Sequence, residues 1–529
     1  MLRGLSVVAF ALSIDTAPAH SQGSAGSAGV GSGSAEASDD EENGSAAGSA
    51  KVLVAPADPN LRLAWLRGRL DGAIASRPLL GAKARITASI VDVETGKEIY
   101  ARDANQAMSL ASNAKLLTSV AALGTLGGGF HWRTTVFIDD KALDEITGNV
   151  KGDLYIRGRG DPTLTIADLR ELATEIAGRG IRTIEGNLVV DTSYFDKDVE
   201  PPHYNEQPKE RAYFRAPVAS FGVGRSSFLV NVIGNPDGTA KVWLEPSAGD
   251  ILKLTKVEVT SIIEGRTRLK LDIKPKKEVL EIEVTGQIKL ADGHWWSRRR
   301  IDDPSRFAAE VFREALRDRG ITIGKKIKFG GIPLTAKPIV VHDSAPLSSI
   351  VREMNKTSDN YFAECVLKTM GAETRATPAP ATWADGQAAV RAYLAKIGLP
   401  PGTYRIDNGS GLFNATEVSA KQLVTLLRAA HSDYRIGPDL LGSLPVGGMD
   451  GTLAKRWQGT PVAGRVRAKT GTLAAARTLA GYVAIDSARP LAFAILINDI
   501  PPGQKPASRA MADDMLETIV AYLEASTKR

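Results

Sequence analysis

Hydrophobic residues recur with different periods along this chain, and the periods predict where helices and strands lie. Across 61–76 apolar residues return every three or four positions, which is typical of one face of a helix. Residues 84–103 alternate instead, and the alternation breaks at a polar Glu-Thr-Gly-Lys stretch, which predicts a β-hairpin. The apolar run over 109–126 predicts a buried helix that begins near Ser112.

After three glycines at 127–129 the pattern changes to short alternating stretches, which predict strands and turns. Two helical patterns interrupt these strands, at 167–180 and at 304–321. A long helical pattern covers 347–371, and three further helices are expected in 383–440. The chain is then expected to end with three strands and one amphipathic helix.

The order of these elements predicts an α/β fold in which one domain of helices and sheet is split by a β-rich insert. We expect the two pieces of the split domain at 53–125 and 341–529. The insert is expected to have two parts, with 146–207 nested inside a domain formed by 126–145 and 208–340.

The N-terminal region has the features of an export signal followed by a spacer. Residues 1–19 contain an arginine, an apolar core and an Ala-Pro-Ala sequence typical of a cleavage site, which predicts a signal peptide and a periplasmic location. Residues 20–52 are mainly glycine, serine and alanine with an acidic patch, which predicts a disordered tether. Nothing later is apolar for 18 residues in a row, so we expect no transmembrane helix.

The composition limits the chemistry that this chain can perform. Of its 529 residues, 43% are hydrophobic and 24% are charged, as in ordinary soluble proteins. Its single cysteine, Cys365, excludes an internal disulfide and a cysteine-rich metal site. The sequence has no HExxH, GxSxG or Walker A motif, so we expect no metal and no cofactor. The net charge of +6 suits an anionic partner such as a wall polymer, and equally a solvated surface without one.

Ser112 and Lys115 stand three residues apart at the start of the apolar run, so a helix would bring both side chains to one face. A serine hydroxyl is a weak nucleophile and needs a base beside it. A lysine becomes such a base when burial and nearby positive charge lower its pKa, and the apolar residues after Lys115 would bury it. The pair predicts a serine nucleophile with a lysine base, against the alternative of a helix N-cap beside a surface lysine.

Two more motifs occur once each, and they favour the catalytic interpretation of Ser112 and Lys115 over the helix cap. They are Ser358-Asp359-Asn360, within the long helical pattern, and Lys469-Thr470-Gly471, at the start of a strand. SxxK, SDN and KTG together are the signature of penicillin-binding proteins and class A β-lactamases. We therefore favour a catalytic site over a chance occurrence.

The segments around the motifs narrow the family. Four of these segments resemble class C low-molecular-mass penicillin-binding proteins: GRGDPTLT, MNKTSDNYFAE, DNGSGL and LPVGGMDGTL. The proteins of this family are serine D-alanyl-D-alanine carboxypeptidases and endopeptidases. The resemblance runs from about residue 60 to the C-terminus, and it includes a large insert between SxxK and SDN, where this chain has 242 residues. It implies a serine β-lactamase/transpeptidase-like domain, peptidoglycan stem peptides as substrate and β-lactams as inhibitors, with no role for nucleic acid.

The resemblance also implies a role for each motif residue. Ser112 would attack the carbonyl between two terminal D-alanines, and Lys115 would take its proton. Ser358 would relay a proton to the departing D-alanine, and Asn360 would hold the substrate amide while bonding Lys115. Lys469 would help to keep Lys115 neutral.

The same resemblance places substrate binding on the KTG strand. Lys469, Thr470 and Thr472 would bind the terminal carboxylate. The backbone N–H groups of Ser112 and Thr472 would form the oxyanion hole. Gly471 would let the strand edge approach the substrate without a side chain in the way.

Several other features have a less certain role in the sequence than the three motifs. Asp359 is expected to point away from the site, and the turn 408–411 is interpreted as structural rather than catalytic. The glycine loop 445–452 either borders the site or is only a loop. Trp295 and Trp296, beside three arginines, indicate either a contact with wall polymer or packing within the insert.

Two alternatives to a serine D-alanyl-D-alanine peptidase remain open at this point. A β-lactamase would need a group that activates water for fast deacylation, and the sequence offers no candidate. A non-catalytic scaffold that binds the cell wall would have no reason to keep all three motifs.

Overall fold

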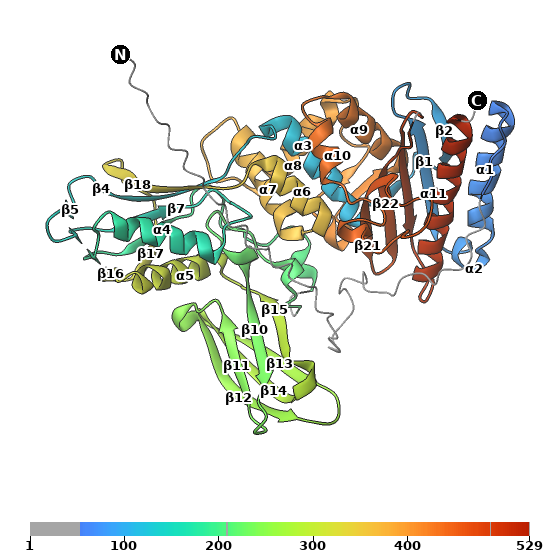
Figure 1. The fold of residues 1–529 in the computed structure, drawn as a ribbon. Helices are drawn as coiled ribbons and strands as arrows, with labels where there is room; N and C mark the ends of the chain where they lie inside the picture. The colour runs from blue at the N-terminus through green and yellow to red at the C-terminus, as the bar shows by residue number, and fades with distance from the viewer. Residues whose placement is uncertain (1–52, 208–209, 487, 528–529) are drawn as a thin grey trace, which may run out of the picture. The chain divides into compact units, whose positions relative to one another are not determined.

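The computed structural model describes residues 53–207, 210–486 and 488–527 (Figure 1). The expected signal peptide (1–19) and the whole of the expected tether (20–52) lie outside the described residues, as do residues 208–209.

A five-stranded antiparallel sheet joins the two ends of the chain. Its strand order is β2-β1-β23-β22-β21. The strands are β1 (Arg85–Asp92), β2 (Glu98–Arg102), β21 (Val466–Leu473), β22 (Ala476–Val483) and β23 (Leu491–Asn498). β1 pairs with β23 over its whole length, with Ala88 opposite Ile495. The first and last strands are therefore neighbours, and everything between them is either part of this domain or inserted into it.

Helices cover both faces of this sheet (Figure 1). On one face α1 (Pro59–Ala75) and α11 (Lys505–Thr527) pack against each other and share an apolar core with the sheet. Leu66, Leu70 and Ile74 of α1 are buried there, which confirms the helical face expected in this segment. Each of the two helices buries apolar residues against this core.

The other face carries the helical layer that contains the SxxK and SDN motifs, whereas KTG lies on β21. Its helices are α3 (Ala114–Leu126), α6 (Leu347–Thr357), α7 (Asn360–Thr374), α8 (Trp383–Lys396), α9 (Ala420–Ser432) and α10 (Gly437–Ser443). α3 is its central helix, and ten consecutive residues from Ala114 to Leu123 are buried. A helix that is buried all round needs apolar residues on most of its sides, which explains the largely apolar run.

The helix expected over 347–371 is interrupted, so that expectation was wrong. Ser358 ends α6 in a left-handed conformation, with φ 60° and ψ 34°. Asp359 then begins α7, because its carboxylate accepts a hydrogen bond from the backbone N–H of Phe362 at 3.1 Å. The SDN motif therefore lies at the junction of two helices and not within one.

The first part of the insert is a layered α/β unit. Its larger sheet has the order β17-β9-β7-β4-β18, and α4 (Ile166–Gly178) and α5 (Pro304–Asp318) pack with it. The strands are β4 (Arg133–Asp139), β7 (Leu154–Arg157), β9 (Leu188–Asp191), β17 (Ile327–Phe329) and β18 (Ala336–Asp343). A smaller sheet is built from β5 (Leu143–Asp144), β6 (Asn149–Val150), β8 (Thr183–Ile184) and β16 (Thr322–Ile323).

The second part of the insert consists of two three-stranded sheets over residues 227–300. One has the order β11-β10-β15, and the other has the order β12-β14-β13. The strands are β10 (Ser227–Gly234), β11 (Ala240–Glu245), β12 (Leu252–Ile262), β13 (Arg268–Lys276), β14 (Val279–Lys289) and β15 (His294–Arg300).

The strand pairing favours a different nesting from the one expected. β7 and β9, within 146–207, pair with β4 and β17, so this segment shares a sheet with both sides of the insert. We propose on this basis that 227–300 is the nested part.

Three short strands complete the split domain, in the order β19-β20-β3. They are β3 (Ala107–Ser109), β19 (Arg405–Ile406) and β20 (Thr416–Ser419), and the four-residue helix α2 (Pro78–Gly81) follows α1. Within the described part of the chain, no helix is both long and apolar enough to cross a bilayer.

Candidate active site

Ser112 lies in a short 3-10 turn, Ala111–Asn113, that leads into α3. Ala111 has a φ of 45°, a left-handed conformation that is strained for a residue with a Cβ. The turn is tied to the sheet, because Thr478 on β22 donates a hydrogen bond to the Leu110 carbonyl at 2.7 Å. The fold therefore holds Ser112 on a strained turn, as is common for functional residues.

β21 packs directly against this turn. The Asn113 side chain, with its nitrogen facing the strand, donates to the Lys469 carbonyl at 2.7 Å. A Cβ on Gly471 would lie 2.7 Å from the Leu110 carbonyl oxygen and would collide with the hydroxyl of Thr478. Gly471 thus has a packing role in addition to the one expected from the resemblance, because only glycine lets the strand come this close to the Ser112 turn.

The Lys115 amine lies at the centre of a hydrogen-bonded cluster. It is 3.0 Å from the Ser112 hydroxyl oxygen, 2.7 Å from the side-chain oxygen of Asn360 and 3.1 Å from the Ser410 carbonyl. The side chain is fully buried. A neutral amine has two N–H groups and one lone pair. Since the side-chain oxygen of Asn360 and the carbonyl oxygen of Ser410 can only accept, they take the two N–H groups, and the lone pair is left for the Ser112 hydroxyl.

Burial lowers the pKa of the Lys115 amine from 10.5 to about 7, while the charges of Glu364 and Asp359 act in the opposite direction. The resemblance implies that Lys469 also helps to lower the pKa of Lys115. The main cause is desolvation by the apolar α3 and its neighbours. A base with a pKa close to neutrality is half deprotonated at neutral pH and well matched to proton transfer.

The SDN junction supplies two side chains to the same cluster. Asn360 accepts from Lys115 and donates through its nitrogen to the Phe214 carbonyl at 3.1 Å. The Ser358 hydroxyl accepts a hydrogen bond from the Lys469 amine at 2.9 Å. The junction therefore connects Lys115 on α3 with Lys469 on β21.

Asp359 faces away from this cluster. Its carboxylate caps α7 and lies 3.0 Å from the guanidinium of Arg225. This placement agrees with the structural role interpreted from the sequence.

The KTG segment forms an edge of the five-stranded sheet. Residues 445–447 pair with the outer side of β21, but only as far as Ala468. Beyond that point Thr470 and Thr472 are half-buried on the edge strand. Thr452, from the glycine loop, is hydrogen-bonded to the hydroxyl of Thr470 at 2.8 Å, so this loop borders the site. An edge strand of this kind can pair with an extended peptide.

Glu364 is the main residue that the sequence reasoning missed. Its fully buried carboxylate accepts hydrogen bonds from the backbone N–H groups of Gly409 (3.0 Å) and Ser410 (2.8 Å). The Ser410 carbonyl in turn accepts from Lys115. The turn 408–411 thus belongs to the cluster through its backbone. A signal was present, because Glu364 follows Asn360 by four residues and shares its helix face.

The insert also reaches the site, which no sequence pattern indicated. The Tyr204 hydroxyl lies 3.2 Å from the hydroxyl of Ser410, and Phe214 provides the carbonyl that Asn360 contacts. Arg215 joins these two residues, because it follows Phe214 and its guanidinium donates to the Tyr204 carbonyl. Contacts of this kind depend on chain segments far apart in the sequence, so local patterns carry no trace of them.

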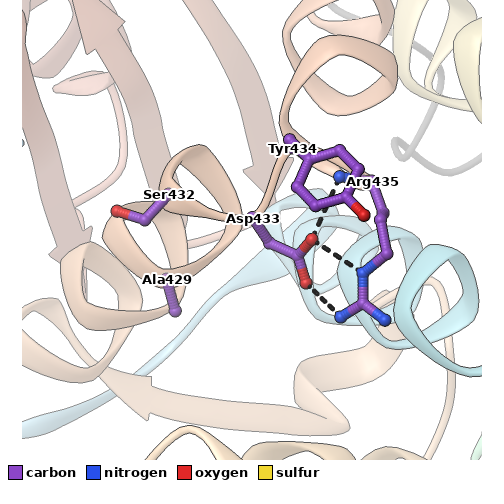
Figure 2. Close-up of a pocket in the computed structure, with 5 residues that line it drawn as sticks. All are labelled: Ala429, Ser432, Asp433, Tyr434 and Arg435. Atoms are coloured by element: carbon purple, nitrogen blue, oxygen red, sulfur yellow. Dashed lines mark hydrogen bonds and ion pairs between the residues drawn. The ribbon is translucent and has the colours of Figure 1, made fainter.

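Among the described residues, no three histidine, cysteine, aspartate or glutamate side chains lie close enough together to hold a metal ion. A surface recess beside the end of α9 has a volume of about 420 Å³. Figure 2 shows this recess, in which Asp433 and Arg435 are paired. It contains none of the motif residues.

Comparisons with known proteins show the family to which this chain belongs. Residues 66–519 match the model of the D-Ala-D-Ala carboxypeptidase 3 (S13) family. The chain is 32% identical over 475 residues to the D-alanyl-D-alanine carboxypeptidase of Actinomadura sp. (strain R39), covering 87% of this chain and 85% of that protein. It is 27% identical over 401 residues to D-alanyl-D-alanine carboxypeptidase DacB of Haemophilus influenzae, covering 75% of this chain and 81% of the relative.

The fold is shared with a solved structure. The crystal structure of penicillin binding protein 4 from Haemophilus influenzae matches with a TM-score of 0.72 at 23% identity, over 84% of this chain and 98% of that one. The α/β fold class expected from the sequence is confirmed. The match to the family model and the 32% identity to a curated carboxypeptidase together show that the chain belongs to the D-Ala-D-Ala carboxypeptidase 3 (S13) family.

Proposed function

We propose that this protein is a periplasmic serine D-alanyl-D-alanine carboxypeptidase that removes the terminal D-alanine from peptidoglycan stem peptides. The proposed intermediate is an acyl-enzyme on Ser112. Because the same intermediate serves the cleavage of D-alanyl cross-links, the proposal includes DD-endopeptidase activity. The predicted signal peptide at 1–19 supports the location.

One observation carries this proposal above the others. Lys115 is fully buried, and its amine lies 3.0 Å from the Ser112 hydroxyl with two acceptors on its other sides. This arrangement directs the lone pair of a neutral lysine at the nucleophile. A surface lysine beside a helix cap would have no such set of partners.

Acylation begins when the Ser112 oxygen attacks the carbonyl carbon of the penultimate D-alanine while Lys115 takes the hydroxyl proton. The developing oxyanion is stabilised by the backbone N–H groups of Ser112 and Thr472. The C–N bond then breaks, and Ser358 relays a proton to the departing amine. The Lys469 contact at 2.9 Å positions the Ser358 hydroxyl for this relay. Water hydrolyses the ester in the second half-reaction and restores Ser112.

Substrate recognition is assigned to the edge of β21. The substrate's terminal carboxylate pairs with the charge of Lys469 and accepts hydrogen bonds from the hydroxyls of Thr470 and Thr472. The hydrogen bond between the hydroxyls of Thr452 and Thr470 holds the Thr470 side chain in place. Asn360 holds the amide of the stem peptide, since its position between Lys115 and the Phe214 carbonyl fixes its orientation.

We further propose that β-lactams inhibit the protein by acylating Ser112 as substrate mimics. A relative supports this, because a crystal structure of Haemophilus influenzae penicillin binding protein 4 was solved as a complex with a β-lactam.

The experiment that tests the function compares two short peptides, one ending in D-Ala-D-Ala and the other in D-Ala-L-Ala. The wild-type protein should release D-alanine from the first peptide only, and Ser112→Ala should lower the rate by at least about 1,000-fold. Rapid hydrolysis of benzylpenicillin without peptide hydrolysis would instead indicate a β-lactamase. Activity on neither compound would indicate a scaffold.

A further inference from the structure

One face of the β11-β10-β15 sheet presents aromatic and basic side chains to solvent. Strand pairing places Trp243, Asn231 and Trp296 in one row across this face. Neighbouring rows hold Lys241, Ile233 and His294 on one side and Glu245, Leu229 and Arg298 on the other. Side chains on the opposite face, such as those of Val230 and Val232, are fully buried in the insert core.

Two of the aromatic rings on this face contact each other. The rings of Trp243 and His294 stack with centroids 5.4 Å apart and planes 9° apart. His294 is also hydrogen-bonded to the side-chain oxygen of Asn231 at 3.0 Å, and the Lys241 amine lies 5.4 Å above the Trp243 ring. Trp296 is 55% exposed. A large aromatic ring left in water beside a stacked ring pair is typical of a binding surface.

The same face continues to the candidate active site. Arg298 lies over the ring of Tyr213, with its guanidinium carbon 5.8 Å from the ring centroid. Tyr213 precedes Phe214, whose carbonyl accepts the hydrogen bond from Asn360. Arg298 and Tyr213 therefore connect this sheet with the chain segment that contacts the SDN junction.

We propose that this face, defined by Lys241, Trp243, His294, Trp296, Arg298 and Tyr213 and called the aromatic track, binds the glycan strand of peptidoglycan while a stem peptide occupies the active site. The inference rests on the proposed function, because it assumes that the substrate is the wall polymer.

The chemistry of the aromatic track fits a glycan strand better than other occupants. Sugar rings have apolar C–H faces that pack on aromatic rings, and their polar edges need hydrogen-bonding groups beside the platform. The stem peptides along the strand carry carboxylates, which Lys241 and Arg298 attract, while Glu245 is the single acidic residue in the three rows. A short substrate reaches only the catalytic cluster, but a polymer with many linked stems gains affinity from a second site.

The test measures binding to insoluble peptidoglycan by co-sedimentation, in a Ser112→Ala background that prevents turnover. We expect Trp296→Ala to weaken binding about tenfold, as for a central aromatic residue of an interface. Tyr434→Ala is the matched control, because Tyr434 is an 84% exposed aromatic side chain at the recess of Figure 2. It should bind as tightly as the parent, and thermal unfolding of both variants should confirm that they are folded.

A second sample of peptidoglycan, with its stem peptides removed by an amidase, separates glycan binding from peptide binding. The proposal expects the effect of Trp296→Ala to persist on the bare glycan. Equal binding by Trp296→Ala and Tyr434→Ala would overturn the proposal. A loss of binding in Trp296→Ala that disappears when the stem peptides are removed would also overturn it. Binding to anionic lipid vesicles that depends on Trp296, without such dependence on peptidoglycan, would assign the track to a membrane surface instead.

Failure of this inference can be told apart from failure of the proposed function. Acylation by benzylpenicillin is measured on proteins that retain Ser112, with and without Trp296→Ala. Acylation in both proteins, with no difference in sedimentation, would reject only the aromatic track. Absence of acylation in both would reject the proposed function itself.

Discussion

The carboxylate of Glu364 and the backbone N–H of Ser410 are joined by a hydrogen bond of 2.8 Å, and the Ser410 carbonyl holds the amine of Lys115. An acidic residue buried in the helical layer thus positions one of the two acceptors that orient the proposed base. Burial raises the pKa of the Glu364 carboxyl, while the hydrogen bonds from the turn and the charge of Lys115 oppose that rise. Two effects on catalysis follow from this relationship.

Glu364→Gln should slow acylation and also move its pH dependence. The amide has only one acceptor oxygen, so one of the two backbone N–H groups of the turn loses its partner and the Ser410 carbonyl is held less firmly. The negative charge of Glu364 raises the pKa of Lys115, so its removal should lower that pKa and shift the acidic limb of the rate profile to lower pH. The measurement is the acylation rate from pH 5 to 9.

The control for this variant is Glu171→Gln, an exposed position on α4 that should change neither the rate nor the profile. A slower rate with an unmoved profile would show that Glu364 acts only through structure.

The wild-type rate should itself fall as the pH drops below about 7. The proposed base is the neutral amine of Lys115, whose pKa burial lowers to about 7. Below that value the neutral fraction falls about tenfold for each pH unit, so acylation at pH 5 should be about 100-fold slower than its plateau. Stopped-flow acylation by a chromogenic β-lactam gives the profile, and a rate that stays flat down to pH 5 would exclude Lys115 as the base.

Ser358→Ala and Ser358→Gly form a matched pair that separates chemistry from backbone strain. Both remove the hydroxyl that accepts from Lys469, so both should lower the rate of peptide cleavage by about 100-fold or more. Ser358 has a φ of 60°, which alanine tolerates poorly and glycine accepts, so the glycine variant should be the more stable by about 1 kcal/mol. Equal activity losses with unequal unfolding temperatures are expected, and activity that follows stability would argue against the relay.

Gly471→Ala should damage the site without touching a reacting group. The new Cβ would collide with Thr478 and press on the Leu110 carbonyl, so β21 would have to move away from the Ser112 turn. Displacements of about 1 Å at a catalytic site can cost about 100-fold in rate. Acylation kinetics and thermal unfolding would both report the change.

Gly72→Ala is the control for this steric argument. Gly72 lies within α1, and nothing lies within 4 Å of a Cβ added there. That substitution should stabilise the protein by about 0.5–1 kcal/mol and leave acylation unchanged. Similar losses in the two variants would contradict the packing role of Gly471.

Much of the site could be predicted because its chemistry uses fixed local spacings. Ser112 and Lys115 need only one helical turn to meet, and the apolar run after them indicated in advance that Lys115 is buried. The helices at 61–76 and 304–321 and the hairpin at 84–103 were predicted correctly, because each carries one clear period.

The rest depends on contacts that no local pattern encodes. The helical period continues through Ser358, so only the capping preference of Asp359 could have indicated the break. The contacts of Ser410 with Lys115, and of Phe214 with Asn360, join segments that are 295 and 146 residues apart. The nesting of the insert is equally hard to predict from local patterns, since strand partners such as β9 and β17 are distant in the sequence.

The most direct test of the central claim is the intact-protein mass after incubation with benzylpenicillin, for the wild type and for Ser112→Ala. We expect one stable adduct, with the mass of one benzylpenicillin, on the wild type and none on the variant. An adduct on Ser112→Ala, or no adduct and no hydrolysis with the wild type, would contradict Ser112 as the nucleophile.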